Sequence, residues 1–387
     1  MTDTYDRLPP PSDLPPDVYE TILRAGRPVA IYGMGNGAEK LLLHFGERGI
    51  AVSDFFASDE FVRGQSFHGY PVRSYADVRA RCPQMLPVLA FASNREEVIA
   101  RILEIDRKTP LLVPDLPVAG EEDFTPEFYR EHAEEISSAY DLLADELSRR
   151  VYTSVLWYKL TGRLEPLLAY TSDTAEIYKL LNNKSIKCEI DVGAYRGDTL
   201  CESVQYFKDL KVAYAVEPDP KNYAKLTLTA EKLSPLTVIP IHAAAGDKEG
   251  VAVIHGSGNR NSSTVGASYR HRDVTVSVRP VDSFATHTVD YIKYDVEGAE
   301  EAALHGSEET IRRDRPALLV SAYHRSRDIF ALPLLLSEKY PFYRFYLRRT
   351  RCIPAWEIAL IALPAEVSED GGEKSTSPSC KTDQDVL

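Results

Sequence analysis

Cysteine is scarce in this 387-residue sequence, and its five cysteines are widely spaced. No two of them form a C-x-x-C pair, so neither a disulfide framework nor a structural zinc site is expected. Long apolar runs are also missing, since no stretch approaches the roughly 18 residues of a membrane-spanning helix. The first residues are acidic and proline-rich and lack the basic and apolar segments of a secretory signal. We therefore expect a cytoplasmic protein.

Positive charge is in short supply as well. The sequence has 45 lysines and arginines against 58 aspartates and glutamates, a net charge of 45 − 58 = −13. Such a chain repels phosphate backbones and anionic membranes, which argues against a nucleic-acid partner. The same charge suits a cationic ligand. We expect a small-molecule partner and leave open whether the chain forms a homo-oligomer.

The order of apolar segments predicts an α/β protein built from two Rossmann-like units joined by a helical connector. Apolar runs alternate with helical patterns, which is typical of a parallel sheet covered by helices. The predicted parts are a disordered leader (1–20), an N-terminal Rossmann-like accessory unit (21–120), the connector (121–170), a second α/β unit (171–365) and a disordered tail (366–387). The strands predicted in the second unit are 188–193, 212–217, 237–243, 274–281, 290–295, 316–322, 342–348 and 358–363.

A glycine turn follows the first strand of the second unit, in the sequence D-V-G-A-Y-R-G-D. Gly193 lets the backbone approach a ligand without a Cβ in the way, and Gly197 tightens the turn into a helix. Ligands of open α/β sheets bind at this edge. Glu217 ends the next strand, where a carboxylate can accept both hydroxyls of a ribose. These features predict a nucleoside-containing ligand; a helix-capping turn beside a solvated Glu217 is the alternative.

The turn has the form D-x-G-x-x-x-G, which is not the pattern that binds a pyrophosphate. Acidic residues crowd it instead, namely Glu189, Asp191, Asp198 and Glu217. This charge favours S-adenosylmethionine, whose amino group and sulfonium are both positive.

Three segments of the second unit resemble the FkbM family of S-adenosylmethionine-dependent methyltransferases. They are D-V-G-A-Y-R-G-D-T, V-E-P-D-P-K-N-Y-A-K-L and D-Y-I-K-Y-D-V-E-G-A-E, and the resemblance covers about residues 175–363. It implies a seven-stranded class I methyltransferase sheet. It also implies O-methylation of a hydroxyl on a sugar, glycan or other natural product.

The resemblance also implies roles for individual residues. Asp191, Gly193, Ala194 and Gly197 are expected around the methionine and ribose of the cofactor, and Glu217 at the ribose hydroxyls. Ala244 and Ala245 are expected to flank the adenine, although a plain strand end followed by a turn explains that segment equally well.

Asp295 ends the strand that carries the D-V-E-G-A-E block, so it is expected to face the departing methyl group. A base that accepts the proton of the acceptor hydroxyl accelerates transfer by ~10²–10⁴-fold. Asp295, Glu297 and His324 are the candidate catalytic bases. Glu297 and Glu300 could instead cap the following helix, and His324 could be bonded to a loop. No metal is expected; the alternative is that Asp295, Glu297, Glu300 and His324 hold a divalent ion.

The N-terminal unit carries a second glycine-rich turn. Gly33, Gly35 and Ala38 fit G-x-G-x-x-G/A between a strand and a helix, and Asp54 follows Gly33 by 21 residues. This spacing indicates a second nucleotide site with Asp54 on the ribose. A packing role for the glycines is the alternative.

The sequence therefore predicts a small-molecule or glycan O-methyltransferase. Two other functions stay open. One is a nucleotide-dependent oxidoreductase or sugar-modifying enzyme that uses the N-terminal unit, and the other is a non-catalytic scaffold that retains the cofactor pocket.

Overall fold

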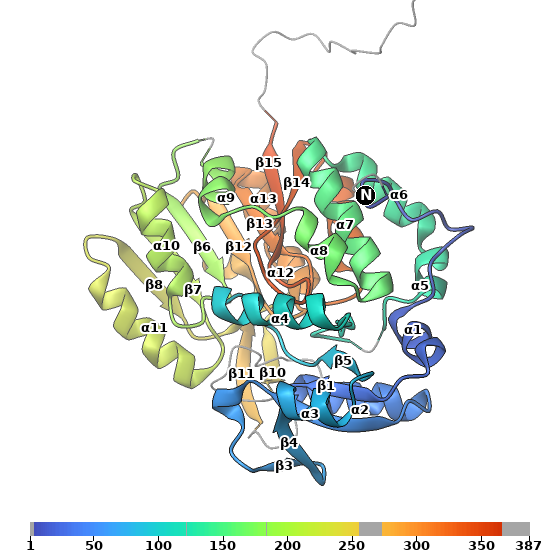
Figure 1. The fold of residues 1–387 in the computed structure, drawn as a ribbon. Helices are drawn as coiled ribbons and strands as arrows, with labels where there is room; N and C mark the ends of the chain where they lie inside the picture. Colours follow the sequence, from blue (N-terminus) through green and yellow to red (C-terminus); the bar gives the residue numbers. More distant parts are fainter. Residues whose placement is uncertain (1–3, 121, 183, 255–272, 366–387) are drawn as a thin grey trace, which may run out of the picture.

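The computed structural model describes residues 4–120, 122–182, 184–254 and 273–365. The predicted tail (366–387) lies outside these residues. The described part forms an N-terminal α/β unit, a set of connecting helices and a second α/β unit with a larger sheet (Figure 1). No helix in the described ranges is long and apolar enough to cross a bilayer.

The N-terminal unit is a five-stranded sheet in the order β3-β4-β2-β1-β5. Strands β4, β2, β1 and β5 are parallel, and the short β3 pairs antiparallel with β4. The strands are β1 (Val29–Tyr32), β2 (Val52–Ala57), β3 (Ser66–Phe67), β4 (Tyr70–Ser74) and β5 (Leu86–Leu89). The helices are α1 (Val18–Ala25), α2 (Asn36–Glu47), η1 (Asp59–Phe61), α3 (Tyr75–Arg81) and α4 (Glu96–Lys108). The continuous apolar runs β1 and β5 are fully buried, as expected of central parallel strands.

The predicted disordered leader is wrong from residue 4 onward. Backbone carbonyls of this segment accept hydrogen bonds from the connecting helices: Tyr129 Oη donates to Pro9 O at 2.7 Å, and Trp157 Nε1 to Arg7 O at 2.9 Å. Helix α1 then begins at Val18 behind an Asp17 cap. Proline-rich composition signals disorder only where nothing else satisfies the backbone, and here aromatic side chains far along the chain do so.

The connector consists of α5 (Pro126–Glu131), α6 (Ala133–Leu142), α7 (Glu146–Thr161), α8 (Leu164–Ala169) and α9 (Thr174–Leu181). Thr125 caps α5 by accepting from Phe128 N at 3.1 Å, and Pro126 opens the helix. Helix α7 is buried along most of its length. Its preceding residue Asp145 pairs with Arg348 of the second unit at 2.6 Å. The connector is thus packed against the second unit along its length.

The second unit contains the predicted seven-stranded sheet, in the order β14-β15-β13-β12-β6-β7-β8. β15 runs antiparallel between β13 and β14, and the other neighbouring strands are parallel. The strands are β6 (Cys188–Val192), β7 (Val212–Val216), β8 (Thr237–Ile241), β12 (Tyr291–Tyr294), β13 (Ala317–Ser321), β14 (Tyr343–Arg349) and β15 (Ile358–Pro364). The helices are α10 (Asp198–Tyr206), α11 (Pro220–Lys232), η2 (Val281–Ser283), α12 (Glu300–His305), α13 (Glu308–Asp314) and α14 (Asp328–Lys339).

One predicted strand of this unit belongs elsewhere. The segment predicted over 274–281 forms β11 (Val274–Arg279), which pairs with β10 (Gly250–Ile254) and β9 (Ala244–Ala245) in a separate three-stranded sheet. Val276 is buried between the exposed Thr275 and Ser277, which suits a sheet with one solvent-exposed face rather than a buried central strand.

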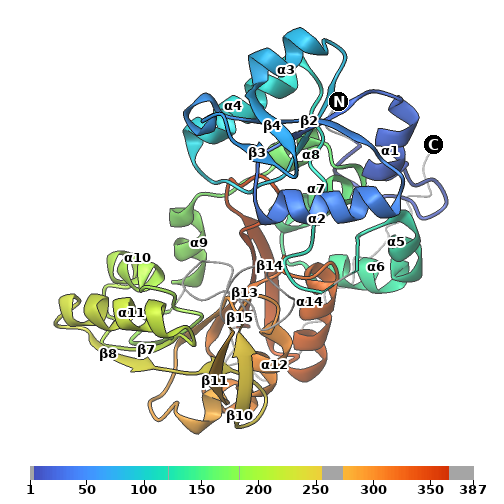
Figure 2. The same cartoon turned by 90° about the horizontal axis from the view of Figure 1, so that it is seen from below.

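The two units and the connector share one core. The largest cluster of buried apolar side chains joins Tyr32 of the N-terminal unit, Tyr152 of the connector and Ile292 of the large sheet. Figures 1 and 2 show the N-terminal unit lying against one end of the second unit. This placement brings the ends of both sheets to the same region.

Candidate active site

A single cavity of about 1120 Å³ lies where the carboxyl ends of the two parallel sheets face each other. Residues after β6, β7, β12 and β13 line one side, and residues after β1 and β5 line the other. Its acidic lining residues are Asp198, Glu202, Glu217, Asp247, Asp295, Glu297 and Glu357, and its basic ones Lys40, Lys293 and His324. Within the described residues the lining is therefore predominantly acidic.

The turn after β6 is shaped by close contact between strand ends. Gly193 adopts φ +95°, and a Cβ there would lie 1.9 Å from the carbonyl oxygen of Asp295. Gly193 lines the cavity, but the missing Cβ makes room for the β12 backbone as well as for any ligand. Gly197, at φ +86°, caps α10, and its Cβ would meet Thr229 of α11.

Glu217 lies at the end of β7 and lines the cavity. Its carboxylate accepts hydrogen bonds from Tyr195 N at 2.9 Å and Asp219 N at 2.8 Å, which fix its orientation. Burial raises the pKa of Glu217 to about 7, against the lowering effect of these two backbone donors. The group is held in place and is ready to accept further hydrogen bonds when ionised.

Lys293 of β12 lies between the carboxylates of Asp191 and Asp295. Its Nζ donates to Thr199 Oγ1 at 2.9 Å and lies 3.6 Å from Asp191 and 3.5 Å from Asp295. Burial opposes the charge of Lys293, but the two aspartates keep its pKa above the ordinary value. The ammonium therefore stays charged and partly neutralises both carboxylates.

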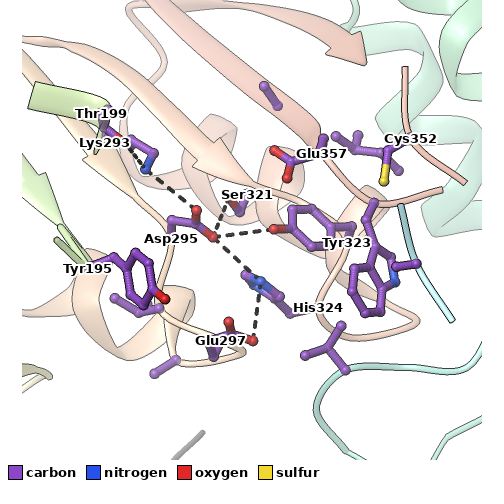
Figure 3. A pocket seen from close by; sticks show the side chains of 18 of the residues that line it. Tyr195, Thr199, Lys293, Asp295, Glu297, Ser321, Tyr323, His324, Cys352 and Glu357 are labelled. Carbon is purple, nitrogen blue, oxygen red and sulfur yellow. Dashed lines mark hydrogen bonds and ion pairs between the residues drawn. The ribbon is translucent and has the colours of Figure 1, made fainter. Parts of the chain in front are cut away.

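Asp295, directly after β12, is the centre of a polar cluster (Figure 3). Its Oδ1 accepts from Ser321 Oγ at 3.0 Å and from Tyr323 Oη at 3.5 Å, and it lies 3.5 Å from His324 Nε2. Burial works against the charge of Asp295, yet Lys293 and His324 lower its pKa below the ordinary value. Asp295 is thus a stable carboxylate and a weak proton acceptor.

His324 is surrounded by three carboxylates and is 1% exposed. Its Nδ1 lies 2.8 Å from Glu300 Oε1, and its Nε2 lies 3.9 Å from Glu297 Oε2 in addition to the contact with Asp295. Burial alone would lower the pKa of His324, but the carboxylates, Glu300 above all, raise it to about 10. The imidazole is therefore protonated at neutral pH.

Glu297 differs from the other acids of the cluster. Burial raises its pKa to about 7, although the charge of His324 opposes this effect. It lines the cavity and has a left-handed backbone, with φ +54°. A carboxylate with a pKa near neutrality is well matched to accept and release a proton.

Residues 191–350 match the family model of the methyltransferase FkbM domain. The chain carries an FkbM methyltransferase domain. This match lies inside the segment for which the sequence motifs indicated the resemblance, and it confirms that interpretation.

Solved structures extend the comparison to the fold. The methyltransferase FkbM from Methylobacillus flagellatus KT matches with a TM-score of 0.66 and 20% identity, over 90% of this chain and 93% of that one. An rRNA methylase from Streptococcus thermophilus matches 50% of this chain and 95% of that one, with 9% identity and a TM-score of 0.33. A comparison with curated proteins gives no match. The first match is too long to involve the FkbM domain alone, so the N-terminal unit shares its fold as well.

The FkbM domain brings only part of the predicted cofactor set to the cavity. Gly193, Glu217, Ala244 and Ala245 line it. Three predicted contacts lie behind the surface instead. Asp191 is buried beneath Lys293, Ala194 packs in an apolar cluster with α10 and α11, and Gly197 faces α11. Neighbouring residues of a short turn point in different directions, and the sequence motif does not specify which of their side chains face a ligand.

The predicted catalytic residues of the FkbM domain do come together. Asp295, Glu297 and His324 all line the cavity, and His324 lies 3.5 Å from Asp295 and 3.9 Å from Glu297. The raised pKa of His324 favours its charged form at neutral pH, which does not suit a base, and a catalytic role for His324 stays a prediction. In the metal alternative these residues and Glu300 would share an ion; the described residues contain no group with metal-holding geometry, and the carboxylates surround the imidazole instead.

The second nucleotide site is only partly supported. Gly33 and Gly35 have left-handed φ values of +123° and +137°, and Gly35 lines the cavity, while Ala38 is buried in the apolar core of the N-terminal unit. Asp54 lies within β2, three residues before its end, and pairs with Arg73 at 3.3 Å. Asp54 therefore does not line the cavity as predicted, because 21 residues after Gly33 the chain is still inside β2 and not at its carboxyl end.

Sequence reasoning missed Lys293, Ser321 and Tyr323 as members of the FkbM site. Lys293 is two residues before Asp295, so the two side chains share one face of β12. Ser321 is the last residue of β13 and Tyr323 follows it by two residues, and both hydroxyls donate to Asp295. Period-2 spacing from Asp295 points to Lys293, whereas Ser321 and Tyr323 lie three and one residues before His324 and are not reached by that spacing.

Proposed function

We propose that the chain transfers a methyl group from S-adenosylmethionine to a hydroxyl of a sugar, a glycan or another hydroxylated natural product. The observation that carries this proposal is the arrangement of Glu217 and the Asp295 cluster in one cavity. Glu217 lies at the end of β7, and Glu297, whose pKa is raised by burial to about 7, lies beyond the end of β12. The two strands flank β6, so both groups border the turn at Gly193.

The acidic, hydrogen-bond-accepting groups of the cavity fit S-adenosylmethionine. The acidic lining suits its two positive centres, and Glu217, which lines the cavity, would accept from the ribose hydroxyls. Gly193 would lie along the methionine side, with Ala244 and Ala245 near the adenine. When bound, the cofactor supplies an electrophilic methyl group.

The chain's own residues would then orient the acceptor and take up its proton. Positioning a nucleophile for in-line displacement can contribute ~7–11 kcal/mol. Asp295, ionised and fixed by Ser321, can accept a hydrogen bond from the acceptor hydroxyl. Glu297 would receive the proton as the base, and the charged His324 holds both carboxylates in place.

A cytoplasmic location is part of the proposal. The described cysteines Cys82, Cys188, Cys201 and Cys352 are all unpaired. Free thiols are what a reducing compartment leads one to expect. The oligomeric state stays a prediction.

Titration with S-adenosylhomocysteine and transfer of a radioactive methyl group from S-adenosylmethionine test the proposal. Glu217→Ala should weaken binding by about 1–3 kcal/mol, because charged hydrogen bonds to two hydroxyls are lost. Glu231→Ala, an exposed acid on α11, is the matched control and should bind like the parent. Unchanged affinity in Glu217→Ala would remove the ribose assignment. Binding of NAD(H) in place of S-adenosylhomocysteine would favour the oxidoreductase alternative.

A further inference from the structure

The wall of the cavity opposite the Asp295 cluster belongs to the N-terminal unit. The backbone leaves β1 and β5 at this wall, where it exposes polar and aromatic side chains to the cavity: Asn36, Phe91, Ser93 and Asn94. Asn36 is the first residue of α2, and Asn94 precedes α4 by two residues. Amide side chains can both donate and accept hydrogen bonds, as neighbouring hydroxyls require.

Specific contacts place this wall over the reactive end of the cavity. Ser93 forms two backbone hydrogen bonds with Ile353, of 2.8 and 3.0 Å, and thereby fixes the loop that carries Trp356 into the cavity. Ala119 N donates to His324 O at 2.9 Å. A Cβ on Gly298 would lie 2.3 Å from that of Ala119, so the side chain of Ala119 packs closely against Gly298, beside Glu297. The N-terminal unit is thus held against the residues that flank the proposed base.

The space between the two walls is larger than a cofactor needs. Ligand pockets of about 300–1,000 Å³ enclose most of a drug-sized molecule. A cavity of about 1120 Å³ with aromatic residues on both sides leaves room for an acceptor next to the cofactor. On the FkbM side, Tyr323 and Trp356 are stacked with ring centroids 6.5 Å apart.

Charge restricts which acceptors fit. The described lining has seven acidic side chains against two lysines and one histidine. Lys40, the lysine of the N-terminal wall, donates to Pro117 O at 2.8 Å and to Val118 O at 3.4 Å, and so ties α2 to the following chain. Lys293 and His324 are engaged by carboxylates. Each of these three cations already has other partners, so a phosphate group in the described part of the cavity would mainly be repelled by the carboxylates.

We infer that the N-terminal unit forms the second half of the acceptor site and binds an acceptor that is polyhydroxylated and uncharged or cationic, rather than a nucleoside diphosphate sugar. This inference rests on the proposed function. It assigns the glycine-rich turn to acceptor recognition through Asn36 and Asn94, in place of a second nucleotide site.

Binding to the full chain saturated with S-adenosylhomocysteine tests the inference. Three panels serve as probes in saturation-transfer NMR titrations: neutral disaccharides, amino sugars and nucleoside diphosphate sugars of glucose, galactose and mannose. The variants are Asn36→Ala and Asn94→Ala. Asn182→Ala is the matched control, since Asn182 is exposed at the end of α9 and does not line the cavity.

Members of the neutral or amino panel should bind the parent chain, and the nucleoside diphosphate sugars should not. Asn36→Ala and Asn94→Ala should weaken this binding about 3–10-fold, as expected for one or two lost hydrogen bonds. All three variants should keep parent affinity for S-adenosylhomocysteine. Preferred binding of nucleotide sugars, parent-like binding by both wall variants or no binding by any panel would overturn the inference. If the parent chain does not bind S-adenosylhomocysteine, the proposed function itself is refuted instead.

Discussion

His324 and Glu300 form a buried ion pair, with Nδ1 of the imidazole 2.8 Å from Oε1 of the carboxylate and both side chains at most 2% exposed. Glu300 also accepts from Val296 N at 2.9 Å, so it fixes the turn that carries Glu297. The pair therefore joins the end of β13 to the start of α12. It holds the positive charge around which Asp295 and Glu297 are arranged.

Replacing His324 should cost stability in a pH-dependent way. His324→Gln leaves Glu300 buried without its partner, which typically costs about 3–5 kcal/mol. Folding raises the pKa of His324 from 6.5 to about 10. Its contribution is therefore complete below pH 6.5 and is lost as pH rises through 10. Urea unfolding at pH 6, 8 and 9.5 should show a difference between parent and variant that shrinks with rising pH. A constant difference would contradict the charged state of His324.

Glu297→Gln should lower turnover ~10²–10⁴-fold, because the proton acceptor is lost, while affinity for S-adenosylhomocysteine stays near that of the parent. In the parent, kcat/KM should rise with pH through about 7, since Glu297 must be ionised to act. The matched control is Glu301→Gln, whose side chain is 71% exposed on α12. Parent-like turnover in Glu297→Gln would exclude Glu297 as the base.

The strand-end motifs correctly predicted which residues lie at the carboxyl edge of the large sheet. Gly193, Glu217 and Asp295 follow buried apolar strands, and parallel strands bring their carboxyl ends to one edge whatever the rest of the chain does. The sequence could not show that the pKa of His324 is raised, because Glu300, the largest of the causes that raise it against burial, approaches His324 only in the folded protein. Nor could it predict the opposing wall, since the pairing of Ser93 with Ile353 joins residues 260 positions apart and has no local signal.

Gly193→Ala should destabilise the chain rather than only block a ligand. The added Cβ would lie 1.9 Å from Asp295 O, and the residue would keep φ +95°. The sequence predicted an effect on ligand binding alone, so the test is the free energy of unfolding measured in urea. Gly46→Ala is the control, because Gly46 is in helix α2 with no atom within 4 Å of the added Cβ. That change should stabilise the chain by about 0.5–1 kcal/mol. Equal stability of the two variants would exclude the backbone clash.

Asp295→Asn distinguishes a positioning carboxylate from a base. The low pKa of Asp295 makes it a poor proton acceptor, so its loss should reduce turnover less than the loss of Glu297. The charge of Asp295 raises the pKa of Glu297. Removing that charge should therefore move the rising limb of the pH profile to lower pH. Asparagine keeps an oxygen that can accept from Ser321, so geometry changes little.

Ser321→Ala is the matched control for this shift, since it removes the hydrogen bond to Asp295 and leaves the charge in place. In Ser321→Ala the rising limb of the pH profile should stay at the same pH as in the parent, even if turnover falls. A carboxyl-carbon NMR titration of Glu297 in chain labelled with 13C-glutamate gives the same comparison without an acceptor. If Asp295→Asn loses turnover as completely as Glu297→Gln and leaves the titration of Glu297 unmoved, Asp295 is the base and the two roles are reversed.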